Sequence, residues 1–253
     1  MARAQEPPSQ QVPFVLDGSR SSRPARLASV VVAELARQII SGQLAAGTVL
    51  PTEPALCEQF GFSRTVMREG LKLLEEHGLV RVEQGRGTTV QPRDSWNLLD
   101  PAVLEIALEY DDDLVLFDDL ISIRRLLEAD MARSAATRLT DEELAELQRS
   151  VDDMSGAMDD YEQFRGLDLA FHAVVMSASG SEIGRTIVGT IHRYAGTLPR
   201  LSSATPRLSL ERTAAEHRKI LESLRARDGD GAAAAIAAHI GSAWDERRTG
   251  RFG

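Results

Sequence analysis

Residues 63–90 of the chain read SRTVMREGLKLLEEHGLVRVEQGRGTTV. The apolar residues of the first half recur at the spacing of one helical face: Met67, Leu71 and Leu74. This spacing predicts a helix over residues 64–77 that begins after Ser63, a favoured N-cap residue. Two short strands, 79–83 and 88–90, are expected around the Gln-Gly-Arg-Gly turn, because glycines suit a tight hairpin. The stretch therefore predicts a helix followed by a two-stranded wing.

Two further helices are expected upstream of this stretch. Apolar residues at helical spacing predict the first, from Arg26 to about Gly42: Val32, Leu35, Ala36 and Ile39. Thr52 is a suitable N-cap for the second, over residues 53–60. Together with the helix at 64–77, this second helix forms a helix-turn-helix. Three helices and a hairpin predict a winged helix-turn-helix domain over residues 26–91.

The remaining segments differ in kind from this domain. Residues 1–25 hold four of the ten prolines and no periodic apolar face, so we expect a disordered tail. Residues 92–100 also lack a clear period and begin with Pro92, which is typical of a linker. Beyond them, seven stretches have the apolar spacing of helices: about 101–109, 114–137, 141–157, 160–178, 182–198, 208–227 and 231–247. The expected fold class is mainly α, with an all-helical bundle over residues 101–247 after the winged domain.

The composition limits the classes of function. A chain of 253 residues has room for two domains, and no apolar run approaches the 18 residues that a membrane span needs. The single cysteine, Cys57, permits no intrachain disulfide and agrees with a reducing, cytoplasmic location. Residues 1–92 hold ten basic and nine acidic side chains, and residues 93–253 hold nineteen and twenty-nine, which gives +1 and −10. A nucleic acid is therefore expected to bind only the first part.

A row of cations is expected on one face of the helix at 64–77. Arg64, Arg68 and Lys72 repeat every four residues, and Thr65 adds a hydroxyl beside them. Such a row can contact phosphates and guanine edges in a major groove. The alternative is an ordinary solvated face, because three glutamates share the helix: Glu69, Glu75 and Glu76. The row alone leaves both interpretations open.

A second group of polar residues lies among apolar ones in the C-terminal half. His217 and His239 each fall on the apolar stripe of their own helix, and Asp168 and His172 are one turn apart on another. A carboxylate near an apolar core costs several kcal/mol unless it is paired or binds a cation. One carboxylate and three imidazoles suit Zn²⁺, Ni²⁺, Mn²⁺ or Fe²⁺ better than Ca²⁺ or Mg²⁺. We expect a divalent transition metal, with zinc first among these ions. Each histidine taken singly could instead be a hydrogen-bonded core residue.

The N-terminal motifs resemble a known family. The residues ISGQLAAGTVLPTE at 40–53, FGFSRTVMREGL at 60–71 and GRGTTV at 85–90 are similar to the DNA-binding domain of the GntR family of bacterial transcription regulators. The resemblance implies that six residues contact operator DNA, the last three from the wing: Arg64, Thr65, Arg68, Gln84, Gly85 and Arg86. Pro54 stands where many members have Arg, so a contact that the family makes there is lost or replaced.

The C-terminal half, over about residues 114–247, resembles the FCD ligand-binding domain of FadR-like GntR proteins. The resemblance rests on Asp168 with Phe171-His172, on Glu216-His217, and on the stretch that ends in Ala-Ala-His239. It implies that four residues hold the metal: Asp168, His172, His217 and His239. It also implies that a small carboxylate or sugar-acid effector binds beside the ion, held by Arg124 and lined by His192. The alternatives are a surface position for Arg124, four residues before Glu128, and a core role for His192.

These expectations converge on a homodimeric, ligand-responsive transcription regulator, a repressor that leaves its operator when the acid binds. The residues Trp96-Asn-Leu-Leu-Asp100 also resemble sugar-acid regulators of the galactonate type. The alternatives are a direct metal sensor and a metal-dependent enzyme that acts on a small carboxylate. An enzyme is not expected, because the chain has no His-Glu-x-x-His motif and no separate nucleophile constellation. No membrane partner is expected.

Overall fold

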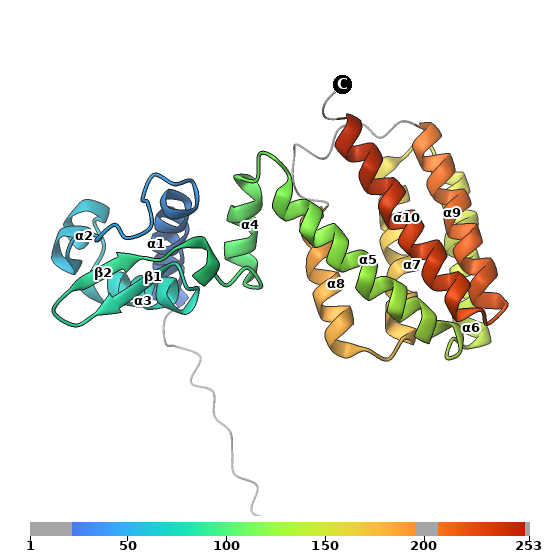
Figure 1. The fold of residues 1–253 in the computed structure, drawn as a ribbon, viewed down its shortest axis with the longest axis horizontal. Helices are drawn as coiled ribbons and strands as arrows, with labels where there is room; N and C mark the ends of the chain where they lie inside the picture. Colours follow the sequence, from blue (N-terminus) through green and yellow to red (C-terminus); the bar gives the residue numbers. More distant parts are fainter. Residues whose placement is uncertain (1–21, 196–206, 251–253) are drawn as a thin grey trace, which may run out of the picture. The chain divides into compact units, whose positions relative to one another are not determined.

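The computed structural model describes residues 22–195 and 207–250. The chain divides into two compact units, Met1–Val103 and Leu104–Gly253. Figure 1 shows a small unit with one hairpin and a larger unit of long helices. The expected fold class, a winged helix-turn-helix followed by an all-helical bundle, is confirmed.

The first unit contains three helices and a hairpin: α1 (Ser22–Ile40), α2 (Glu53–Phe60), α3 (Arg64–Glu76), β1 (Val80–Glu83) and β2 (Gly87–Val90). The strands pair antiparallel, with Val80 opposite Val90. The apolar face predicted for α3 is buried against α1. The two helices lie close together at Gly70, where a Cβ atom would lie 2.9 Å from Cγ1 of Val31. The absence of a side chain there lets α3 pack tightly on α1.

The helices begin near the capping residues seen in the sequence, although the Thr52 hydroxyl makes no capping hydrogen bond to α2. Ser63 caps α3, because its hydroxyl accepts the backbone N–H of Val66. α1 begins at Ser22, four residues before the predicted start and inside the segment predicted to be a tail. Pro24 is compatible with this, because the first turn of a helix makes no use of its backbone N–H groups. The rest of the predicted tail lies outside the described residues.

The segment predicted to be a linker, residues 92–100, lies against the end of α3. It contains a short 3₁₀ helix, η1 (Arg93–Ser95), and the backbone N–H of Asn97 donates to the carbonyl oxygen of His77. Gly78 has φ of +75°, and a Cβ atom there would overlap the carbonyl oxygen of Ser95. Glycine therefore satisfies both the left-handed backbone and the close approach of the segment.

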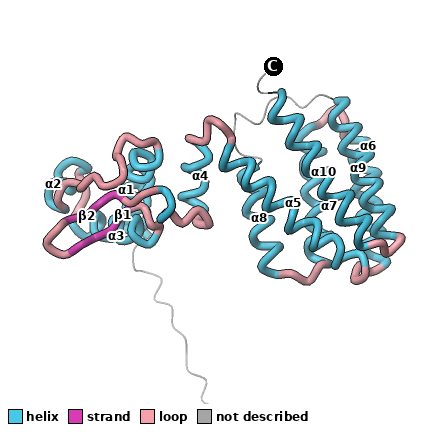
Figure 2. The backbone as a smooth tube through the Cα atoms, viewed as in Figure 1, coloured by secondary structure: helices cyan, strands magenta, loops and turns pink. Residues whose placement is uncertain are grey.

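The second unit is built of helices, whereas both strands lie in the first unit (Figure 2). Its helices are α5 (Val115–Ala136), α6 (Asp141–Gly156), α7 (Tyr161–Ala178), α8 (Glu182–Ala195), α9 (Arg207–Arg225) and α10 (Gly229–Gly250), and α4 (Pro101–Glu109) spans the division between the units. All seven were predicted to within a few residues. Residues 196–198, predicted to end α8, lie outside the described chain.

The bundle is held together mainly by α5 packed along α10, a pairing visible in Figure 1. Phe117 of α5 stacks on Trp244 of α10, with ring centroids 4.8 Å apart. The core between the helices is apolar except for a few buried polar side chains, among them Glu128, His172, His217 and His239. No helix in the described residues is both long and apolar enough to cross a bilayer.

Candidate metal centre and DNA-binding surface

Three inner helices of the second unit bring one carboxylate and three imidazoles together. α7 supplies Asp168 and His172, α9 supplies His217, and α10 supplies His239. One ligand atom from each lies within 4.8 Å of all the others. The Oδ1 atom of Asp168 lies 4.0 Å from Nε2 of His172 and 3.9 Å from Nε2 of His239. The structure thus brings together all four residues that the sequence suggested as ligands.

The outer nitrogen of each imidazole is hydrogen-bonded, which fixes the direction of the ring. His217 donates from Nδ1 to the carbonyl oxygen of Thr213 at 2.8 Å. The Nδ1 atoms of His172 and His239 lie 2.6 Å and 2.9 Å from glutamate oxygens, which belong to Glu128 and Glu216 respectively. A backbone carbonyl and an ionised carboxylate can only accept hydrogen bonds. The ring proton of each histidine therefore lies on Nδ1, and the three Nε2 lone pairs face inward. Such outer partners are typical of metal-bound histidines.

The protein itself offers no hydrogen-bond donor among the described residues to the inner Nε2 atoms of the three histidines. The Nε2 atom of His217 is buried and has no hydrogen-bond partner among the described residues. The Nε2 atoms of His172 and His239 lie 3.3 Å apart, and with both protons on Nδ1 neither can donate to the other. Buried acceptors without a donor cost free energy. A divalent cation coordinated by the four inner atoms removes this cost, so the residues fit a metal ion.

The pKa shifts agree with ligands that are ready to bind a cation. Burial, together with the nearby His239, lowers the pKa of His217 to about 3. Burial also lowers the pKa of His239. For Asp168, burial alone would raise the pKa, but the three imidazoles around it lower it well below the ordinary value. These directions favour neutral imidazoles at His217 and His239 and an ionised carboxylate at Asp168, which is the protonation state that metal binding needs.

Glu128 of α5, which the sequence suggested only as a neighbour of Arg124, is a further functional candidate. It is fully buried, and its two oxygens accept three hydrogen bonds. Oε2 accepts from His172, and Oε1 accepts from Nε of Arg124 at 2.5 Å and from Nε2 of His192 at 2.9 Å. Burial raises the pKa of Glu128, but His172 and Arg124 lower it by more, so the side chain is ionised. The sequence signal was an acidic residue at a position on the buried face of a helix.

The two residues expected to bind an effector meet at this glutamate. Arg124 is ion-paired with Glu128, but its side chain is only 13% exposed, so it is not the surface arginine considered as the alternative. His192 lines a cavity of about 520 Å³ between α6, α7 and α8, together with Arg185, Ser177 and Glu146. Glu128 thereby connects His172, an expected metal ligand, to both residues expected at the effector.

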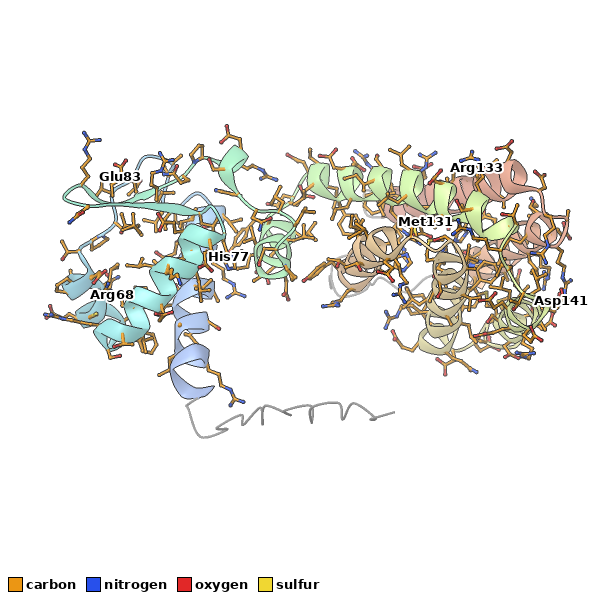
Figure 3. All side chains as sticks on the ribbon, turned by 90° about the horizontal axis from the view of Figure 1, so that it is seen from below. Arg68, His77, Glu83, Met131, Arg133 and Asp141 are labelled. Atoms are coloured by element: carbon orange, nitrogen blue, oxygen red, sulfur yellow. The ribbon has the colours of Figure 1, made fainter. Side chains whose placement is uncertain are left out.

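The residues expected to contact DNA are exposed in the first unit: Arg64, Thr65 and Arg68 on α3, and Gln84, Gly85 and Arg86 at the turn between β1 and β2. Arg68 lies on the outside of the unit (Figure 3) and is only loosely paired, with its Nε atom 4.0 Å from Glu53. Gly85 has φ of +80°, which the hairpin turn requires. Glu75 accepts the backbone N–H of Val82 at 2.8 Å and so attaches the wing to α3.

Two family models match the chain. The model described as bacterial regulatory proteins, gntR family, matches residues 27–90, and the model of the FCD domain matches residues 119–242. The first range contains the exposed residues of α3 and the wing. The second contains the four converging residues of the candidate metal centre together with Glu128, Arg124 and His192.

Individual proteins and structures are similar over most of the chain. The galactonate operon transcriptional repressor of Escherichia coli (strain K12) is 31% identical over 212 residues, which is 84% of this chain and 93% of the relative. The Glc operon transcriptional activator of the same strain is 33% identical over 162 residues, or 62% of each chain. The structure of Lar, titled as controlling the Listeria monocytogenes agr system, covers 88% of this chain and 97% of its own at a TM-score of 0.54 and 17% identity, which shows the same fold.

Proposed function

Because this chain belongs to the GntR family of bacterial regulatory proteins and carries an FCD domain, we propose that it is a homodimeric repressor released from its operator by a small organic or sugar acid. The family makes the chain a DNA-binding transcription regulator. The acid would bind in the second unit beside a divalent metal ion. The observation that carries the proposal is the convergence of four donor side chains on one point, three of them buried, where the Nε2 atom of His217 has no hydrogen-bond partner within the described chain.

Four residues would hold the ion: Asp168, His172, His217 and His239. The ligand set of three nitrogens and one oxygen favours zinc, with nickel, manganese and iron as the other candidates. When bound, the ion supplies a positive centre that attracts a carboxylate. Four protein ligands leave room for such a group if the ion takes five or six ligands.

The effector would be recognised by its negative charge. Arg124 uses its Nε–H on Glu128, and a guanidinium has further N–H groups that can bind a carboxylate in bidentate fashion. His192 contacts the same glutamate and lines the nearby cavity. The similarity to the galactonate operon repressor supports sugar acids as the first class to test.

The DNA contacts would come from α3 and the wing. Arg64 and Arg68 would enter the major groove, Thr65 would contact the backbone, and Gln84, Gly85 and Arg86 would reach toward the minor groove. A homodimer presents two such winged domains, so its operator is expected to be pseudo-palindromic. The acid would release the DNA only if it binds one arrangement of the two winged domains more tightly than the other.

A DNA-release experiment tests the proposal. An operator is first selected from a random DNA pool, labelled, and bound to zinc-loaded protein. Galactonate, other sugar acids and dicarboxylates are then titrated while fluorescence anisotropy is followed, with galactose as the control that lacks a carboxylate. We expect one acid to release the DNA, and we expect Arg124→Ala to weaken that response while it retains metal and operator binding.

Other results of this experiment would each point to a different conclusion. Release by metal in the absence of any acid would identify a metal sensor. Turnover of the acid by the loaded protein would support the metalloenzyme alternative. Unchanged acid affinity in Arg124→Ala, measured by calorimetry, would remove this residue from the effector site.

A further inference from the structure

The cavity of about 520 Å³ between α6, α7 and α8 opens on a side of α7 that does not face the candidate metal centre. α7 contributes Ala170 and Ser177 to its lining, and both residues are exposed. They are two and five positions from His172, so they lie about 140° to 160° round the axis of α7 from it. The cavity therefore adjoins the candidate metal centre but contains none of its four proposed ligands.

Part of the lining is made of small or apolar side chains. Ala170 and Ala173 come from α7, and Val188 and Gly189 come from α8. A Cβ atom added at Gly189 would meet no atom within 4 Å, so the space over this part of α8 is open. Apolar walls with a few polar groups are typical of small-molecule sites. This part of the cavity has room for an aliphatic group of a ligand.

Opposite charges line the cavity from two different helices. Arg185 of α8 and Glu146 of α6 both line it, and neither side chain has a hydrogen bond or ion pair among the described residues. Glu143, one turn before Glu146, adds a second carboxylate, which also accepts the backbone N–H of Thr140 at 2.8 Å. Within the described chain, the cavity therefore carries an unpaired cation from α8 and an unpaired anion from α6.

These charges select the kind of ligand. A simple anion would be attracted by Arg185 but repelled by the two glutamates of α6, and a simple cation would meet the reverse problem. A ligand that carries both charges satisfies both walls. We infer that the cavity binds a free α-amino acid with an aliphatic side chain. Its carboxylate would accept hydrogen bonds from Arg185, its ammonium group would donate to Glu146, and its side chain would lie over the alanines of α7.

His192 forms the boundary between this cavity and the candidate metal centre. Its ring lines the cavity, and its Nε2 atom lies 2.9 Å from Oε1 of the buried Glu128. The amino acid and the acid of the proposed function would therefore occupy separate spaces that share this imidazole. The inference goes beyond the proposed function, because release of DNA by the acid alone requires no site for a second ligand.

Calorimetric titration of the full-length, zinc-loaded chain tests the inference. L-Alanine, L-valine and L-leucine are the probes, and the tightest is compared with the two analogues that lack either its amino or its carboxyl group. For leucine these are 4-methylpentanoate and 3-methylbutylamine. We expect one amino acid to bind per chain, and each analogue to bind at least about 10-fold more weakly, because each loses one charged contact.

Neutralisation of either charged wall tests the assignment of the residues. Arg185→Gln and Glu146→Gln should each lower the amino-acid affinity at least about 10-fold, because each removes one charge that the ligand would meet. Arg225→Gln and Glu222→Gln remove the same charges from exposed positions of α9, which contributes no residue to the cavity lining. These two controls should bind the amino acid as the wild type does.

A cavity-filling substitution separates this site from the metal centre. Gly189→Leu places a side chain in the open space, and leucine is a better helix former than glycine, so the helix should be retained. We expect this variant to lose amino-acid binding while it keeps a full equivalent of zinc. Gly156→Leu, at an exposed helical glycine that does not line the cavity, should keep both. Circular dichroism establishes that each variant is folded.

Three results would overturn the inference. None of the three amino acids may bind, an analogue with a single charge may bind as tightly as the amino acid, or Gly189→Leu may retain the wild-type amino-acid affinity. Each of these results would leave the proposed function in place, because release of DNA by an acid is measured separately. Failure of that release with intact amino-acid binding would contradict the proposed function alone.

Discussion

The Nε2 atom of His217 lies 3.3 Å from the Oδ1 atom of Asp168, and no hydrogen bond joins them. Because Thr213 fixes the proton of His217 on Nδ1, Nε2 presents a lone pair to an oxygen that also carries lone pairs. Two acceptors that face each other repel, whereas a cation between them is attracted to both. This pair is therefore the strongest structural indication of where an ion would bind.

Removal of this imidazole should reduce metal binding. We expect His217→Ala, loaded with zinc and dialysed, to retain less than one equivalent of metal in elemental analysis. His77→Ala is the matched control, because His77 lies in the first unit next to Asp100, and it should retain the wild-type amount. A full equivalent of tightly bound zinc in His217→Ala would contradict the ligand assignment.

Neutralisation of Glu128 should weaken both the metal site and the fold. Its two oxygens accept from His172, Arg124 and His192, and a glutamine offers only one acceptor oxygen in their place. We expect Glu128→Gln to lower zinc affinity about 10- to 100-fold and the free energy of unfolding by about 2 to 4 kcal/mol. Calorimetry and urea unfolding measure the two effects.

The exposed Glu146 of α6 provides the control for this substitution. Glu146→Gln should change neither the zinc affinity nor the unfolding free energy. If Glu128→Gln behaves in the same way, the buried glutamate does not hold His172 in place.

The metal-free protein should lose stability as the pH falls below about 6.5. The pKa of His217 is lowered by burial to about 3, and that of His239 is also lowered by burial. At pH values between these lowered pKa values and the ordinary pKa of histidine, the unfolded chain binds more protons than the folded one. The unfolding free energy therefore decreases as the pH decreases. Each such group contributes up to about 1.4 kcal/mol per pH unit in that window.

Urea unfolding at a series of pH values measures this slope. It should be smaller in metal-free His217→Gln, which has one imidazole fewer to protonate on unfolding. An unfolding free energy that stays constant from about pH 7 to pH 5 would show that the imidazoles are not held neutral in the folded protein.

The two kinds of cation on α3 should affect DNA binding differently. Arg68→Ala should weaken binding to the selected operator by about 1 to 3 kcal/mol and relax its base preference if the guanidinium reads a base. Lys72→Ala, one turn further along the same face, should weaken operator and scrambled DNA alike if it contacts phosphate. Anisotropy titrations at a fixed salt concentration measure both. Equal affinities for wild type and Arg68→Ala would place this arginine outside the interface.

The helices could be predicted from the sequence because their signals are local. The bounds of α3 follow from the Ser63 cap and the apolar spacing that ends near Gly78. The four proposed ligands, which the structure brings together, could also be selected from the sequence, since polar residues on an apolar helical stripe are conspicuous and the family resemblance supplied the set. The start of α1 at Ser22 was missed, because a proline-rich segment does not reveal a helix whose first turn contains Pro24.

The contacts between distant segments could not be predicted in the same way. Glu128 is 44 residues from His172 and 64 from His192, and only the packing of α5 against α7 and α8 brings them together. Likewise, no periodic pattern indicated that residues 92–100 lie against the end of α3, since that contact depends on a backbone approach at Gly78. Sequence spacing reports which face of a helix is buried, but not what that face meets.

The most direct test of the metal centre is a crystal structure of zinc-loaded protein with anomalous data collected at the zinc edge. The account predicts one peak per chain, about 2.0 to 2.1 Å from the Nε2 atoms of His172, His217 and His239 and bound by Asp168. A peak elsewhere in the chain, or an ion bound by fewer than three of these imidazoles, would contradict it.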